Sequence, residues 1–201
     1  MIKKIPIALI YLRLILGFIV LYLSYIKIEH YNYIAILLIT IGLLSDIFDG
    51  ILARKLNVAS KLLRRLDSSI DQIFFICVIV ATYLQYPLFF KENWIWLILL
   101  ISSEVLTYVV SFIKFKKEIA THSIGAKIWT LFLFTTLVEI TYSGNSVVLF
   151  QLCFWIGIIT RLEIIAIILI LKKWTNDVPS IFAAIRLRKG KEIRRNKLFN
   201  G

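Results

Sequence analysis

The sequence is poor in the residues that build disulfide scaffolds and histidine metal sites. It has only two cysteines and two histidines among 201 residues. Cys77 and Cys153 lie deep inside apolar runs, which indicates buried thiols with no disulfide or metal role. His30 and His122 fall in loops that we expect on opposite sides of a membrane. These scarcities exclude a disulfide framework and a histidine-based metal centre.

Charged residues are also scarce. They make up 18% of the chain, against 60% hydrophobic residues, and the mean hydropathy is +0.85. These values lie far from those of an ordinary soluble domain and indicate an integral membrane protein. Six apolar runs have the roughly 20 residues that a membrane-spanning helix needs. They cover residues 6–26, 33–53, 66–86, 94–113, 124–142 and 147–171.

We therefore expect an all-α integral membrane bundle of six transmembrane helices over residues 1–174, with no room for a separate soluble domain. The first run is too long for a signal-peptide core and has no small-residue cleavage site after it, so we expect it to be retained. The Tyr86-Pro87 step should end the third helix.

Basic residues gather on one side of this bundle. The net charge is +12, and the loops on one side carry nearly all of it, so the positive-inside rule predicts cytoplasmic N- and C-termini in a cell (inner) membrane protein. Because these residues flank apolar runs, we expect membrane lipids and no nucleic acid as partners. Residues 175–201 should form a basic cytoplasmic tail, either with an interfacial amphipathic helix that begins near Asp177, Pro179 and Ser180 or as a frayed basic segment.

The most informative stretch is SDIFDGILARKLNVASKLLRRLDSSID, which joins the second and third apolar runs. In a helix, Asp46 and Asp49 fall on one stripe of a face, and so do Asp67 and Asp71. Two antiparallel helices joined by a short loop could aim all four carboxylates at one point. Hard divalent cations such as Mg²⁺ favour oxygen-rich sites of this kind.

A plainer alternative is that the four acids are a solvated polar face near the end of the membrane. Each ionised group at bilayer depth costs about 2.5 to 3.5 kcal/mol on insertion scales, so four on converging faces would be a heavy burden without a function. The spacing therefore favours a metal or catalytic site over a solvated face.

The run Asp46-x2-Asp49-Gly50-x2-Ala53-Arg54-x8-Leu63-x3-Asp67-x3-Asp71 resembles the signature of the CDP-alcohol phosphatidyltransferase family, D-x2-D-G-x2-A-R-x8-G-x3-D-x3-D. Only Leu63 departs from it. Pro6, Leu9 and Arg13 are similar to the family's P-N-x-L-T-x-x-R opening. Lys127 and Thr130 resemble its K-x-x-T element.

The resemblance implies a phospholipid-synthesising transferase that uses two divalent cations, Mg²⁺ or Mn²⁺. It would move a phosphatidyl group from CDP-diacylglycerol to a small alcohol and release CMP, as phosphatidylglycerophosphate and phosphatidylinositol-phosphate synthases do. It also implies a homodimer. By position, the metal ligands would be Asp46, Asp49, Asp67 and Asp71.

The resemblance further assigns individual roles. Asp71 would also act as the general base on the acceptor hydroxyl. Gly50 and Ala53 would let the nucleotide approach the helix, and Arg54 would neutralise phosphate charge. Leu63 fills space that a glycine leaves open, so either the donor sits differently or Ala59 or Ser60 opens the room.

The acceptor is left open, with glycerol 3-phosphate, inositol phosphate, inositol and serine as family examples. Lys127, Arg64 and Arg161 are candidates to bind a phosphorylated acceptor. Each could instead be a positive-inside residue, a headgroup contact or half of an interhelical pair.

Two other function classes stay open. A divalent-cation transporter would more naturally place its acids near the midplane within repeated halves, and the sequence holds no second acidic motif. A prenyl-transferring membrane enzyme would typically need two separate aspartate-rich motifs. A purely structural membrane protein gives no reason for the four acids.

Overall fold

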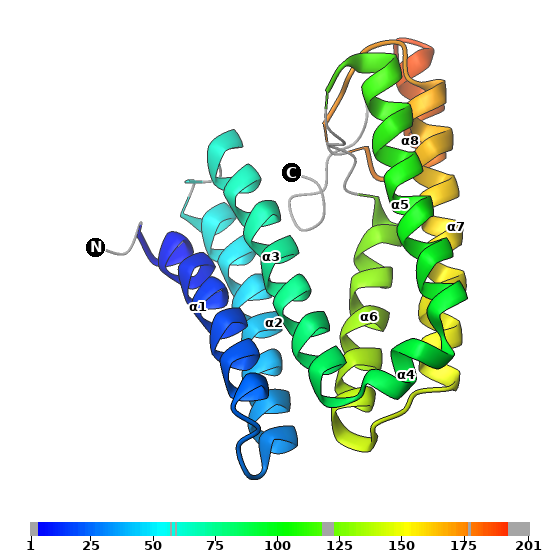
Figure 1. Cartoon of the computed structure of the whole chain (residues 1–201). Coiled ribbons are helices and arrows are strands. Elements are labelled where there is room, and N and C mark those ends of the chain that lie inside the picture. Colours follow the sequence, from blue (N-terminus) through cyan, green and yellow to red (C-terminus); the bar gives the residue numbers. More distant parts are fainter. Residues whose placement is uncertain (1–3, 57, 59, 118–122, 177, 193–201) are drawn as a thin grey trace. The chain divides into compact units, whose positions relative to one another are not determined.

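The chain is all-α in the part that the computed structural model describes, which is residues 4–56, 58, 60–117, 123–176 and 178–192. The helices there are α1 Ile5–Tyr25, α2 Tyr31–Lys55, α3 Lys61–Gln85, α4 Pro87–Glu92, α5 Trp94–Phe115, α6 Ile124–Ser143, α7 Val148–Ile170 and α8 Ile181–Arg188 (Figure 1). Six of them are long and apolar enough to cross a membrane. This confirms the predicted all-α class with six spans, and the protein is a multi-pass membrane protein.

The helix boundaries differ from the expected ones at the third span. Helix α3 begins at Lys61 rather than near residue 66, because Ser60 caps it: its hydroxyl accepts a hydrogen bond from the Leu63 N–H at 3.1 Å. The Tyr86-Pro87 step does end α3, as expected. Pro87 then opens the short helix α4, a position where its missing N–H costs nothing.

The chain divides into two compact units. The first comprises Met1–Glu92 and Leu137–Ser146, and the second comprises Asn93–Thr136 and Val147–Gly201. Helix α6 therefore contributes its first part to the second unit and its end to the first.

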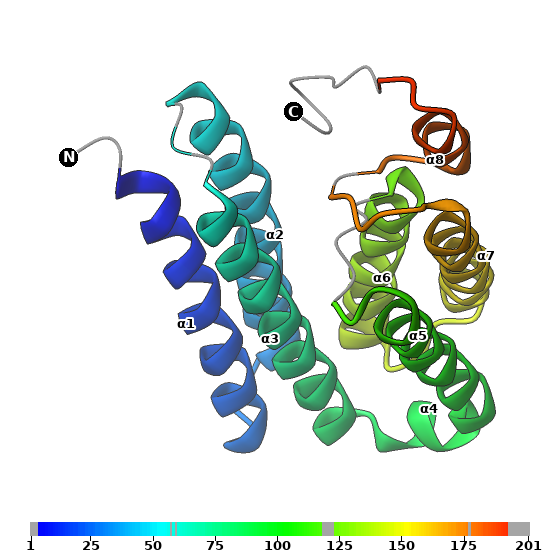
Figure 2. The same cartoon turned by 90° about the horizontal axis from the view of Figure 1, so that it is seen from above.

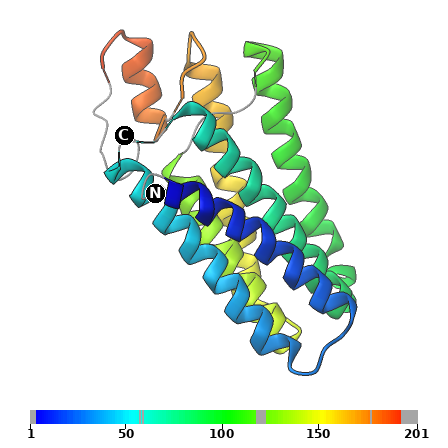
Figure 3. The same ribbon diagram turned by 90° about the vertical axis from the view of Figure 1, so that its left-hand side faces the viewer.

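In the first unit, α1 packs against both α2 and α3 (Figure 3). Its buried residues recur every three or four positions, which places them on one stripe of the helix. The Phe74 ring of α3 is buried against two glycines: a Cβ at Gly17 would lie 3.2 Å from Phe74 Cδ2, and a Cβ at Gly42 would lie 2.8 Å from Phe74 Cε2. Glycines at these two positions let the three helices meet around one aromatic ring.

In the second unit, α7 packs against α5 and α8 (Figure 2). Lys114 near the end of α5 donates to the carbonyls of Ile168 and Leu169 at 3.0 and 2.6 Å. A cation at the carbonyl end of a helix is favourable, because those carbonyls lack helical partners. The same contact shows that α5 and α7 end together, on the side where α8 docks.

Helix α8 begins at Ile181, and the Ser180 hydroxyl caps it by accepting a hydrogen bond from the Ala183 N–H at 3.4 Å. Asp177, expected at the same helix start, lies outside the described residues. The helix packs on α7 through Ala183 and Ala184, which share a small core with Ile167, Leu171 and Val178. Phe182 stays 79% exposed.

Candidate functional site

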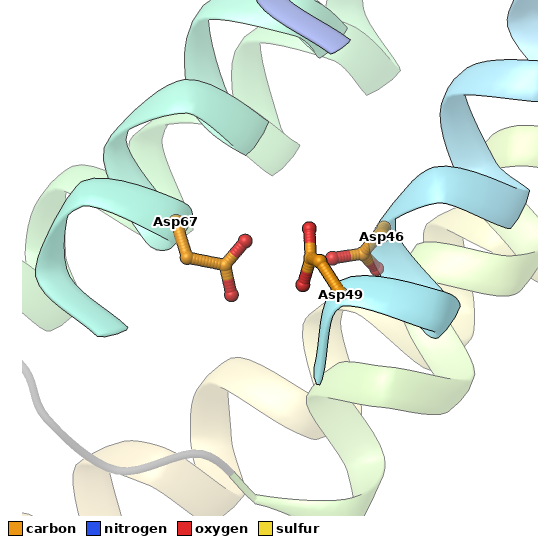
Figure 4. A group of neighbouring side chains, drawn as sticks. All are labelled: Asp46, Asp49 and Asp67. Carbon is orange, nitrogen blue, oxygen red and sulfur yellow. The ribbon is translucent and has the colours of Figure 1, made fainter. Parts of the chain in front are cut away.

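The four acids of the motif come from the facing ends of two helices in the first unit. Asp46 and Asp49 lie one turn apart near the end of α2, and Asp67 and Asp71 lie one turn apart near the start of α3. One carboxylate oxygen from each of Asp46, Asp49 and Asp67 lies within 4.8 Å of the other two. Figure 4 shows these three side chains pointing toward one another across the gap between α2 and α3.

Arg13 of α1 contacts all four acids. Its Nη1 lies 3.1 Å from Asp46 Oδ1 and 3.1 Å from Asp67 Oδ1, and its guanidinium also forms ion pairs with Asp49 and Asp71. Helix α1 can deliver this contact because it packs against both helices that bear the acids. The cluster therefore has a fixed positive charge among its carboxylates.

The cluster is buried on one side and open on the other. The side chains of Arg13 and Asp49 are 1% and 3% exposed, whereas those of Asp46, Asp67 and Asp71 are 35%, 29% and 30% exposed. A molecule approaching this unit would thus reach three of the four carboxylates without any rearrangement.

These residues fit a divalent cation. Every donor is a carboxylate oxygen, which suits hard ions such as Mg²⁺, Mn²⁺ and Ca²⁺. Oxygens on opposite sides of one such ion lie roughly 4 to 5 Å apart, given bond lengths of about 2.0 to 2.6 Å. The spread of the three carboxylates matches that span. Four carboxyl groups face one guanidinium, so a divalent cation would bring the cluster closer to charge balance.

The residues expected to bind the nucleotide follow Asp49 on α2. Ala53 is buried, and Gly50 is half-buried. The guanidinium of Arg54 folds back over Gly50, so that a Cβ on Gly50 would lie 3.5 Å from Arg54 Nη1. The structure therefore brings a positive charge beside the glycine, one turn from the acids.

Leu63 lies in the first turn of α3 and is half-buried. Of the two small residues considered as giving room beside it, Ser60 caps the helix through its hydroxyl. Ala59 lies outside the described residues.

The candidate acceptor residues are divided between the two units. Arg64 is half-buried in the first turn of α3, in the unit that holds the acids. Lys127 is exposed on α6 and Arg161 is buried on α7, both in the second unit. Arg161 Nε donates to Glu104 Oε2 at 2.6 Å, and its Cζ lies 3.6 Å from the centroid of the Trp129 ring. Its guanidinium thus already has an acid and an aromatic partner.

Sequence reasoning did not find the contact between Arg13 and the acids. It identified Arg13 as part of an opening motif. A useful signal was present, because a charge inside a membrane helix needs a partner, and the acids of the next two spans are the nearest candidates in the chain.

The chain matches a known protein family. The family model for CDP-alcohol phosphatidyltransferase matches residues 3–163, a range that holds Arg13 and all four aspartates. No curated protein and no solved structure shows a significant match to the chain.

Proposed function

The chain belongs to the CDP-alcohol phosphatidyltransferase family, and from this membership we propose that it moves a phosphatidyl group from CDP-diacylglycerol to the hydroxyl of a small alcohol, with release of CMP. The observation that carries the proposal is that carboxylate oxygens of Asp46, Asp49 and Asp67 lie close enough to bind one ion. The fourth acid, Asp71, forms an ion pair with Arg13, which also contacts the other three. A family transferase of phospholipid biosynthesis needs such a site at the membrane.

In this proposal Asp46, Asp49, Asp67 and Asp71 hold two divalent cations, Mg²⁺ or Mn²⁺. When bound, the cations would offset the negative charge that builds on the phosphate oxygens in the transition state. The three partly exposed acids give the donor access from the open side of the cluster. Asp49 is buried beside Arg13 and anchors the arrangement.

The reaction would break one P–O bond and form another. The acceptor oxygen attacks the phosphorus that bears the diacylglycerol, and the bond from that phosphorus to the oxygen of the leaving CMP breaks. Asp71, a partly exposed acid one turn beyond Asp67, would accept the proton of the acceptor hydroxyl, which is the role that the family resemblance assigns to its position. The Arg54 guanidinium, beside Gly50 and near Ala53, would neutralise donor phosphate charge.

The acceptor in this proposal is a phosphorylated polyol such as glycerol 3-phosphate, bound by Lys127, Arg64 and Arg161.

We further propose that the termini and the active site face the cytoplasm in the cell (inner) membrane, and that the protein is a homodimer. Residues 1–174 would be the catalytic domain. Residues 175–201 would be a basic tail with an interfacial helix, and in its helix α8 both Phe182 and the basic residues Arg186 and Arg188 are exposed.

The test is CMP release by the purified protein with CDP-diacylglycerol and Mg²⁺ or Mn²⁺. Glycerol 3-phosphate, inositol phosphate, inositol and serine are supplied separately. We expect release that depends on one acceptor, is abolished by a chelator, and falls at least about 100-fold in Asp71→Asn, the loss typical of removing a general base.

Glu92→Gln is the matched control, since Glu92 is an exposed acid of the same unit at the end of α4. It should keep full activity. Release that is independent of acceptor and metal, or that survives Asp71→Asn unchanged, would contradict the proposal. Uptake of metal into proteoliposomes without CMP release would favour a transporter instead.

A further inference from the structure

We propose that Arg13 is a built-in counter-ion of the acidic cluster: it holds the four aspartates together without metal, and divalent cations must compete with its guanidinium for the same carboxylates. The inference rests on the proposed metal site, because it concerns the acids that would bind the ions. It adds a residue from α1 to a site that the motif places on α2 and α3 alone.

Geometry gives Arg13 this role. Its two terminal nitrogens contact every acid of the cluster, from Asp46 and Asp49 on α2 to Asp67 and Asp71 on α3. Its buried Nε has no hydrogen-bond partner among the described residues. The carboxylates are therefore what hold the guanidinium in place.

Charge makes the contact necessary. Four carboxylates this close repel one another, and burial weakens the screening by water. An arginine remains protonated in proteins, so its positive charge is permanent and cannot be lost to accommodate a metal ion. Arg13 therefore stabilises the assembled cluster when no ion is bound.

The same charge opposes metal binding. A divalent cation would bind the same four carboxylates, each of which already gives one oxygen to the guanidinium, and the two positive groups also repel each other at short range. Ions must displace the guanidinium from some of its partners. The partly exposed Asp46, Asp67 and Asp71 are the partners it can give up, whereas Asp49 is buried with it.

The direct test is Mn²⁺ binding in detergent, measured by the loss of the free-ion signal in electron paramagnetic resonance, with no lipid substrate present. In Arg13→Gln we expect Mn²⁺ to bind about tenfold more tightly, because a charge-assisted hydrogen bond no longer has to be broken. Arg13→Lys keeps the charge without the forked geometry and should bind Mn²⁺ with an affinity between the two.

Arg161→Gln is the matched control. Arg161 is also a buried arginine paired with an acid, but that acid is Glu104, outside the cluster. This variant should leave the Mn²⁺ affinity unchanged. A tenfold change in both glutamine variants would overturn the proposal, since it would reflect a general effect of losing a buried arginine.

Thermal unfolding supplies the second readout. Without metal, Arg13→Gln should unfold at a lower temperature than the wild type, and saturating Mn²⁺ should restore most of the difference. If the unfolding temperature of Arg13→Gln lies below that of the wild type by the same amount with and without Mn²⁺, Arg13 has only a structural role, and the proposal is overturned. If Arg13→Gln cannot be purified without metal but is recovered when Mn²⁺ is present throughout, that rescue supports it.

The outcomes separate this inference from the proposed function. If the wild type binds Mn²⁺ and Arg13→Gln and Arg13→Lys bind it no more tightly, the inference fails and the metal site stands. If neither the wild type nor any variant binds Mn²⁺, both fail. If Mn²⁺ binds as expected but no acceptor yields CMP, the inference stands and the proposed reaction fails.

Discussion

Gly50 lies one helical turn before Arg54. The effects of adding a side chain at Gly50 on stability and on function can be measured separately. A Cβ there would meet the Arg54 guanidinium at 3.5 Å, an ordinary van der Waals contact. Gly50→Ala should therefore fold normally and gain up to about 1 kcal/mol from the higher helix propensity of alanine.

The same substitution should impair binding of the donor. If the nucleotide approaches α2 at Gly50, a methyl group there raises the KM for CDP-diacylglycerol while the melting temperature holds or rises. Steady-state kinetics and thermal unfolding of one preparation measure both quantities. An unchanged KM would mean that the donor does not approach this face of the helix.

Two roles for Arg161 can be distinguished by experiment: it pairs α7 with α5, or it binds the acceptor. Its side chain is 6% exposed, with Glu104 at 2.6 Å and the Trp129 ring beneath it. Arg161→Gln should lower the stability of the protein in detergent by about 1.5 to 3 kcal/mol, the usual contribution of a hydrogen bond to a charged group.

A double mutant distinguishes the two roles. If pairing dominates, Glu104→Gln and Arg161→Gln together should cost less stability than the sum of the single changes, because each removes the same contact. An acceptor ligand behaves differently. Arg161→Gln would then raise the KM for the acceptor and leave the unfolding temperature unchanged.

The grouping of the four acids could be predicted from residue types and spacing, but their pairing with Arg13 could not. Asp46 and Asp49 share a helix face by periodicity alone, and so do Asp67 and Asp71. Which helix approaches these faces depends on packing between segments far apart in the chain. Arg13 is 54 residues from Asp67, and the sequence alone indicates that its charge needs a partner inside the membrane but not which helix supplies that partner.

At the scale of the helix, the contact between α2 and α3 depends on Gly42. A Cβ at Gly42 would lie 2.8 Å from Phe74 Cε2, and Phe74 is 1% exposed, so the ring has little room to move. Gly42→Ala should destabilise the protein, because overpacking costs about 1 to 3 kcal/mol and exceeds the gain in helix propensity. Thermal or denaturant unfolding in detergent measures this.

Two further variants define the cause. Gly50→Ala makes the same chemical change on the same helix without meeting the ring, so it should not destabilise. Phe74→Leu removes ring atoms from the site, and in that background Gly42→Ala should cost less than it does in the wild type. An equal cost in both backgrounds would show that the ring is not what resists the methyl group.

The positions of the helices could be predicted where a long apolar run sets them. They were harder to predict where a cap or a packing contact sets the end or the buried face of a helix. Helix α3 starts earlier than its apolar run because Ser60 supplies a cap for a basic first turn. Helix α8 packs through Ala183 and Ala184, whereas its larger apolar residue Phe182 stays exposed. Ile181 and Leu187 pack against the same core, as an apolar stripe predicts, but hydropathy alone does not indicate that Phe182 stays outside while the smaller Ala184 is buried.

At the scale of the whole molecule, the orientation in the membrane can be tested through its two buried cysteines. Cys77 and Cys153 are 6% and 2% exposed, and their replacement by alanine gives a background without thiols. Single cysteines are then introduced at two exposed positions that we expect on the cytoplasmic side, Lys55 and Lys173, and at Glu29 on the other side.

A membrane-impermeant maleimide should label position 29 in intact cells. It should label positions 55 and 173 only in inverted vesicles, because the positive-inside rule keeps those loops in the cytoplasm. Labelling of all three positions from one side would contradict the single membrane crossing by α2 that we expect between positions 29 and 55. Labelling of 55 and 173 from outside would reverse the proposed orientation of the active site.

The long separation between Arg13 and its partners also has a consequence for biosynthesis. Helix α1 leaves the ribosome before α3, so its arginine can reach the membrane before Asp67 and Asp71 lie beside it. An arginine at the centre of a lone helix costs about 2.5 to 3.5 kcal/mol on insertion scales, which favours keeping α1 beside the translocation machinery until α3 arrives. Once α3 arrives and the acidic cluster is complete, the first three helices could then move from the translocation machinery into the lipid together.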